Sequence, residues 1–150
     1  MTAIGEYAIP VISYTFGIIN WTEDEIKNAD ILVRKNLNLY KMFQIKSDVD
    51  HLYVPRAMGG RGLMSLWDSF KTTMVRIAHY LNETDDRQMQ VCAELDKKSL
   101  FSIINKADKF RNATKFNEPS NLNGKRILRQ AKIVAQKFKE ATFCERFNTF

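Results

Sequence analysis

Apolar residues recur every three or four positions between residues 23 and 43, which predicts a long amphipathic helix there. Thr22 stands just before this segment and Glu25 follows three positions later, in the spacing of a capping box. Acidic residues come early in the segment and basic residues late, as the helix dipole favours. The apolar positions are Ile26, Ala29, Val33, Leu37 and Tyr40.

The same spacing predicts further helices toward the C-terminus. One is expected over residues 66–81, a second over about 87–96, and a shorter amphipathic segment over 97–110. Residues 111–124 are rich in asparagine and contain a proline and a glycine, so we interpret them as a linker. The last helix is expected at about 125–146, with its lysines and arginines mainly outside the apolar stripe.

Residues 7–20 are apolar on nearly all sides, which is typical of a buried helix. Pro10 fits such a helix only near its first turn. The β-branched residues of this segment leave a buried strand as the alternative, and we favour the helix. The apolar run from Ala8 to Ile19 is too short to cross a bilayer, and the N-terminus lacks the positive region of a signal peptide. We therefore expect an intracellular protein without a membrane partner.

Three of the six glycines fall within four positions, between two apolar runs at residues 52–54 and 63–66. Apolar runs on both sides of a glycine-rich turn predict a short β-hairpin. The expected fold class is therefore mainly α, with one short β-hairpin. The residues expected to shape the turn are Pro55, Gly59, Gly60 and Gly62.

The chain has 150 residues, enough for one domain with a buried core, and a formal net charge of +6. Such a charge favours an anionic partner, most simply nucleic acid. Many basic side chains fall between residues 34 and 76, where together they would bind phosphate groups; a solubilising surface is the alternative. Tyr53 and Trp67 could stack on bases or belong to the core. The candidate nucleic-acid-binding residues are Arg34, Lys35, Lys41, Lys46, Arg56, Arg61, Lys71 and Arg76.

No catalytic constellation is visible in the sequence. The acidic residues at 48–50 and 85–86 stand in polar connectors, where such pairs usually cap helices. Cys92 and Cys144 are far apart, without the spacing of a zinc site, and are expected to be reduced thiols. His79 lies inside the helix expected over residues 66–81, and we expect it at the boundary between core and surface rather than as a ligand. We expect no catalytic residue, metal ligand or cofactor within this chain.

Two motifs, in this order, resemble the polyproteins of non-LTR (LINE-type) retrotransposons. Residues 7–22 are similar to the family's run A-I-P-V-x-x-Y-S/T-F-G-x-x-x-W-T/S, which enters the thumb of the reverse transcriptase. Residues 52–56 and 59–63 match the motif L-Y-x-P-R-x-x-G-G-R-G-L that follows in that family. The resemblance covers about residues 3–81, and its specificity comes from the ordered pair of motifs.

The resemblance implies a thumb-like helical bundle and the connection beyond it, which in this family grip the template–primer duplex as RNA is copied into DNA. The thumb helices would be the segments before and after Trp21, and the segment from Arg56 to Leu63 would be the connection element. The family's catalytic aspartates, and the Mg²⁺ they hold, belong to a palm upstream. The resemblance therefore implies a fragment that is inactive as an RNA-directed DNA polymerase on its own. Its expected partners are an RNA/DNA template–primer duplex and the remainder of the polyprotein.

The sequence thus predicts four parts: a reverse transcriptase thumb and connection region (1–81), a helical extension (82–110), the linker (111–124) and a basic C-terminal helix (125–150). The first hypothesis for function is a retrotransposon reverse transcriptase fragment that contacts nucleic acid. The alternative is a small helical protein-interaction module, either derived from a retroelement or convergent with one.

Overall fold

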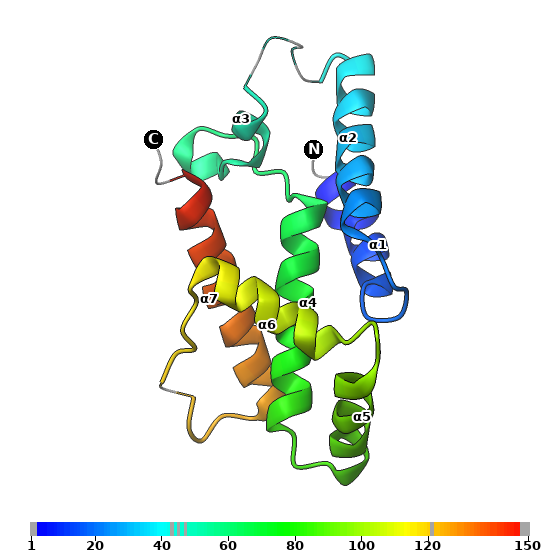
Figure 1. The fold of residues 1–150 in the computed structure, drawn as a ribbon. Coiled ribbons are helices and arrows are strands. Elements are labelled where there is room, and N and C mark those ends of the chain that lie inside the picture. The colour runs from blue at the N-terminus through cyan, green and yellow to red at the C-terminus, as the bar shows by residue number, and fades with distance from the viewer. Residues whose placement is uncertain (1–2, 43, 45, 47, 121, 148–150) are drawn as a thin grey trace. The chain divides into compact units, whose positions relative to one another are not determined.

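The computed structural model describes residues 3–42, 44, 46, 48–120 and 122–147, and these are mainly helical (Figure 1). Within these ranges there are seven α-helices, one π-helix and one 3-10 helix, and there is no β-strand. In chain order the elements are η1 (Ile4–Ala8), α1 (Ile9–Thr15), α2 (Glu23–Leu39), α3 (Asp50–Tyr53), η2 (Arg56–Met58), α4 (Leu66–Glu83), α5 (Arg87–Lys98), α6 (Ile103–Thr114) and α7 (Ile127–Phe147).

The chain divides into two compact units, Met1–Ser69 and Phe70–Phe150, with the division inside α4. The first unit contains the elements from η1 to η2 and the first four residues of α4. The second contains the rest of α4 together with α5, α6 and α7, and in it α6 packs against both α5 and α7. None of the helices in the described ranges is long and apolar enough to cross a membrane.

The N-terminal segment is helical, as predicted, but the expectation of burial on all sides is wrong. Pro10 lies in the first turn of α1, where its missing N–H is tolerated. Of residues 3–20, only Ile9 and Phe16 are buried. Beyond α1, the N–H of Ile19 donates to the carbonyl oxygen of Thr15 at 2.8 Å, so the chain continues on a helical path for one more turn.

The predicted capping box at the start of α2 is confirmed. The hydroxyl oxygen of Thr22 accepts the N–H of Glu25 at 3.3 Å, and the N–H of Thr22 donates to the Glu25 carboxylate at 2.9 Å. The backbone N–H of Thr22, and then its hydroxyl, lower the pKa of the Glu25 carboxyl below its ordinary value, because both stabilise the charged form. The helix therefore begins where purely local sequence signals place it.

Asp30 on α2 forms the N-terminal cap of α4. Its buried carboxylate accepts the hydroxyl of Ser65 at 2.9 Å, the N–H of Leu66 at 2.9 Å and the N–H of Trp67 at 3.2 Å. The first N–H groups of a helix have no acceptor within the helix, and a negative charge is favourable at this end of the helix dipole. A single side chain thereby fixes the start of α4 to the middle of α2.

The predicted β-hairpin between residues 50 and 66 is wrong. Its first arm is the short helix α3, in which the consecutive residues Leu52 and Tyr53 are both buried. A strand would turn these two side chains to opposite faces. Asp48 favours the helical turn, because its carboxylate accepts the N–H of Asp50 at 3.1 Å. The glycines do mark a reversal of the chain, but a helix and a 3-10 turn lead into it.

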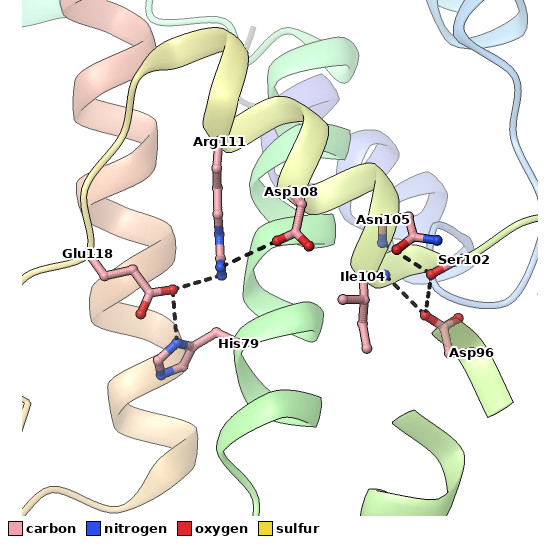
Figure 2. A network of polar contacts seen from close by, with 8 residues as sticks. All are labelled: His79, Asp96, Ser102, Ile104, Asn105, Asp108, Arg111 and Glu118. Carbon is pink, nitrogen blue, oxygen red and sulfur yellow. Dashed lines mark hydrogen bonds and ion pairs between the residues drawn. The ribbon is translucent and has the colours of Figure 1, made fainter. Parts of the chain in front are cut away.

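The second unit repeats the capping device of the first. The carboxylate of Asp96, on α5, accepts the hydroxyl of Ser102 at 2.9 Å and the N–H groups of Ile103 and Ile104 at 3.1 and 3.0 Å. The oxygen of Ser102 in turn accepts the N–H of Asn105 at 3.1 Å. Figure 2 shows Asp96 and Ser102 together at the start of α6. This cap fixes α6 to the end of α5.

The helix bounds of the second unit agree with the sequence at α5 and α7 and differ at α6. The predicted segment 97–110 begins later, at Ile103, and extends into the predicted linker as far as Thr114. Two pairs of phenylalanine rings pack edge to face in the core. The ring centroids of Phe70 and Phe110 lie 6.1 Å apart, and those of Phe116 and Phe138 lie 5.5 Å apart. The buried apolar residues around them include Met74, Val75, Ala78, Ile104, Ala107, Ala131 and Val134.

Replacing Asp30 by alanine should destabilise the protein by about 3 kcal/mol, because it leaves a hydroxyl and two helix-terminal N–H groups without their charged acceptor. Urea unfolding followed by circular dichroism measures this loss. Glu94→Ala, which removes an exposed carboxylate from α5, is the matched control and should change stability by less than about 0.5 kcal/mol. Equal effects of the two substitutions would show that the Asp30 cap contributes no specific stability.

Candidate nucleic-acid surface

Residues 50–63 form a closed turn held by main-chain hydrogen bonds. The N–H groups of Arg61, Gly62 and Leu63 donate to the carbonyl oxygens of His51, Val54 and Leu52, at 3.0, 2.8 and 2.8 Å respectively. At the tip of the turn, the carbonyl oxygen of Pro55 accepts the N–H groups of Met58 and Gly60 at 2.9 and 3.1 Å. The returning segment is therefore bonded to the helical arm along its length, which makes the turn a rigid support for its side chains.

The turn imposes different demands on two of its glycines. A Cβ atom on Gly60 would lie 2.1 Å from the carbonyl oxygen of Val54, so the closed turn has no room for a side chain there. Gly59 ends η2 with φ of +85°, in the left-handed region that L-residues adopt at a cost, but nothing lies within 4 Å of its added Cβ. The third glycine, Gly62, lies beside the side chain of Arg56.

Arg56 and Arg61 are both exposed on this turn. The Nε–H of Arg56 donates to the carbonyl oxygen of Arg61 at 3.4 Å, which folds the first arginine back across the turn. The methylene groups of Arg56 pass Gly62, because its Cγ lies 3.3 Å from the position that a Cβ on that glycine would take. The two guanidinium-bearing residues therefore belong to one small surface.

Arg34 connects the turn to α2. Its Nη1–H donates to the hydroxyl oxygen of Tyr53 at 3.0 Å, and Tyr53 is buried. Of the two roles considered for Tyr53, the structure shows the core role. Arg34 itself is half-buried, whereas the adjacent Lys35 is exposed. Arg34 therefore positions the turn, and Lys35 supplies an exposed positive charge on the same helix.

The remaining candidates divide between the two units. Lys41 and Lys46 are exposed and belong to the first unit, with Arg34, Lys35, Arg56 and Arg61. Lys41 has φ of +56° and occupies the position after α2 that usually favours glycine, with the N–H of Met42 donating to the carbonyl oxygen of Leu37 at 2.9 Å. Lys71 is half-buried and Arg76 exposed on the part of α4 that belongs to the second unit.

Charge is distributed unevenly between the units. The first unit has seven lysines and arginines against eight aspartates and glutamates, and the second has sixteen against nine. Within the first unit, however, residues 31–65 contain six basic and two acidic residues, so its positive charge is concentrated around the turn and the end of α2. The candidate nucleic-acid-binding residues predicted from the sequence do not include the exposed basic residues of α7, although a charge count for each half of the chain points to them. They include Arg129, Lys132 and Lys139.

Trp67, the second aromatic candidate, is half-buried next to the Asp30 cap. The Nζ of Lys27 lies 5.3 Å from the centroid of its ring, a cation–π contact. Lys27 also pairs with Glu23 one turn earlier on α2. Trp67 therefore helps to hold α2 against the start of α4.

A polar cluster around the buried His79 lies in the second unit (Figure 2). His79 on α4 has a side chain only 3% exposed, and its Nδ1 lies 3.4 Å from an oxygen of Glu118. The Nη2 of Arg111, on α6, lies 2.9 Å from the same oxygen. The cluster ties the loop after α6 to both helices, so His79 is a core residue and not the boundary residue that was predicted. No group of three or more His, Cys, Asp or Glu side chains suited to a metal ion occurs among the residues that the structure describes.

Comparison with known proteins adds no assignment. No family model matches the chain, and no match was found among curated proteins or solved structures. Any hypothesis for the function of this chain therefore depends on the two sequence motifs and on the geometry of the turn.

Replacing Gly60 by alanine should destabilise the protein by about 3 kcal/mol or more, because the new methyl group overlaps the main chain at Val54. Gly59→Ala is the matched control and should cost only about 1 kcal/mol, the penalty of a left-handed backbone in open space. Chemical unfolding measures both. If the two variants lose equal stability, the closed turn is not the native arrangement.

Proposed function

We propose that residues 3–81 act as the thumb and connection region of a LINE-type reverse transcriptase and bind a template–primer duplex of RNA and DNA. The observation that carries this proposal is the ordered pair of motifs at residues 7–22 and 52–63. The second motif coincides with the closed turn, in which its tyrosine, proline and glycines take part in packing or main-chain hydrogen bonds. Its two arginines are exposed.

Exposed arginines on a rigid turn suit the recognition of phosphate groups. A guanidinium group keeps its charge at any physiological pH and presents several N–H donors in a fixed plane, which match the oxygens of a phosphate. Because the turn is closed by main-chain hydrogen bonds, little conformational freedom of its backbone remains to be lost on binding. Arg56 and Arg61 would thus contact the sugar–phosphate backbone of the duplex.

The exposed lysines of the first unit would add affinity without reading base sequence. Lys35, Lys41 and Lys46 belong to the end of α2 and the segment that follows it. Contacts to phosphates release condensed counterions and bind any sequence alike. A template–primer duplex changes its sequence at every step of copying, so binding of this kind is what a duplex-gripping element requires. Polymerisation itself is assigned to residues outside this chain.

The double substitution Arg56→Gln/Arg61→Gln should weaken binding to an RNA–DNA hybrid duplex about tenfold at low salt, since it removes two phosphate contacts. The plot of log affinity against log salt concentration should become shallower by about 2. Fluorescence anisotropy with a labelled hybrid measures both quantities, and circular dichroism verifies that the variant is folded.

Arg87→Gln is the matched control, because Arg87 is an exposed arginine that follows Asp85 and Asp86 in the sequence and belongs to the second unit, not to the first. It should leave the affinity and the salt dependence close to those of the unaltered chain. Failure of the unaltered chain to bind the hybrid at low salt would refute the proposed function and favour the alternative, a small helical protein-interaction module.

A further inference from the structure

A stripe of large apolar side chains is exposed along the N-terminal helical segment. We call it the N-terminal stripe, and its residues are Tyr7, Val11, Tyr14 and Ile18. They are 71%, 69%, 79% and 73% exposed, respectively. Isolated exposed apolar residues are common on protein surfaces, but four in a row along one helical path are not.

The stripe lies opposite the face that packs into the first unit. Ile9 and Phe16 form the buried face and are seven residues apart, about two helical turns. Val11, Tyr14 and Ile18 are spaced by three and four residues, and at 3.6 residues per turn they lie about half a turn away from Ile9 and Phe16. Folding of the first unit therefore leaves the stripe uncovered.

The segment is also nearly free of charge. Glu6 is the only charged residue between residues 3 and 22, in a chain where 27% of residues are charged. Depletion of charge together with exposed aromatic and aliphatic side chains is the composition of a protein–protein interface core. It does not suit nucleic acid, whose phosphates require positive charge.

We propose that the N-terminal stripe pairs with the same stripe of a second copy of this chain. The stripe together with Ile19, which is 51% exposed, offers roughly 600 Å² of accessible surface, so two copies would bury at most roughly 1,200 Å², the lower end of specific interfaces. The chain carries a net charge of +6, which opposes association of two copies, but an uncharged stripe keeps that repulsion away from the contact.

A two-fold arrangement fits the pattern of the stripe. Its residues, which lie on η1, α1 and the turn after α1, follow a four-three-four spacing like that of the apolar seam of a coiled coil, so two such segments can interlock their side chains in register. In an antiparallel pair the central Val11 and Tyr14 of one copy meet Tyr14 and Val11 of the other, and the interface is self-complementary. The tyrosine rings fill the seam while their hydroxyl groups reach water at its edge.

Sedimentation equilibrium of the full chain tests the pairing. The unaltered chain should change from a 17.5 kDa monomer to a dimer of twice that mass between about 1 and 100 µM. Val11→Glu should remain monomeric over this range, since it places two carboxylates in the apolar seam. Leu128→Glu is the matched control, because Leu128 is 67% exposed on α7, and it should dimerise like the unaltered chain.

A mixing experiment shows whether the stripe meets itself. Val11→Glu and Val11→Lys chains should each be monomeric alone and should form a heterodimer when mixed, because the opposite charges then lie in the same seam, less than one helical turn apart. A chain that stays monomeric throughout, or a Val11→Glu variant that dimerises like Leu128→Glu, would refute self-pairing. The first of these results would leave the stripe to a different protein partner.

Discussion

The buried carboxylate of Asp30 is the interaction on which the first unit depends. It joins α2, on which Asp30 lies, to the start of α4 at Leu66, which follows Asp30 by thirty-six residues. Burial of a carboxylate is unfavourable unless hydrogen bonds replace its hydration, and here a hydroxyl and two N–H groups do so. Because the closed turn lies between these helices in the chain, Asp30 fixes its exit, as the bond from Arg34 to Tyr53 fixes its position on α2.

The second unit uses the same chemistry at Asp96, at a much shorter sequence separation. In both units an aspartate on one helix accepts a serine hydroxyl and the N–H groups of the two residues that follow this serine, where a later helix begins. Such caps satisfy donors that no helix can satisfy by itself, and they set the direction in which the helix starts. Packing of apolar faces then supplies the bulk of the stability.

The sequence predicted what depends on neighbouring residues. The capping box of Thr22 and Glu25 acts over three positions, and the apolar period of α4 repeats along its whole length, so both could be recognised without a structure. The role of Asp30 could not, because an aspartate inside an amphipathic helix looks like a surface residue until its distant donors are known. The glycine-rich turn was mistaken for a β-hairpin because both structures need glycine where the chain reverses. The closed turn differs from a hairpin in its first arm, which is helical at Leu52 and Tyr53. The exposed N-terminal stripe was equally hidden, since an apolar segment does not reveal which of its faces the fold covers.

The central claim is that the first unit contacts nucleic acid through the closed turn, although the net positive charge of the chain comes entirely from the second unit. Titration of the ¹⁵N-labelled chain with an RNA–DNA hybrid duplex, followed by two-dimensional NMR, distinguishes the two surfaces directly. The largest shift changes are predicted at the amides of residues 56–63 and of Lys35, Lys41 and Lys46. Shift changes confined to α7, or no changes at all, would contradict this claim.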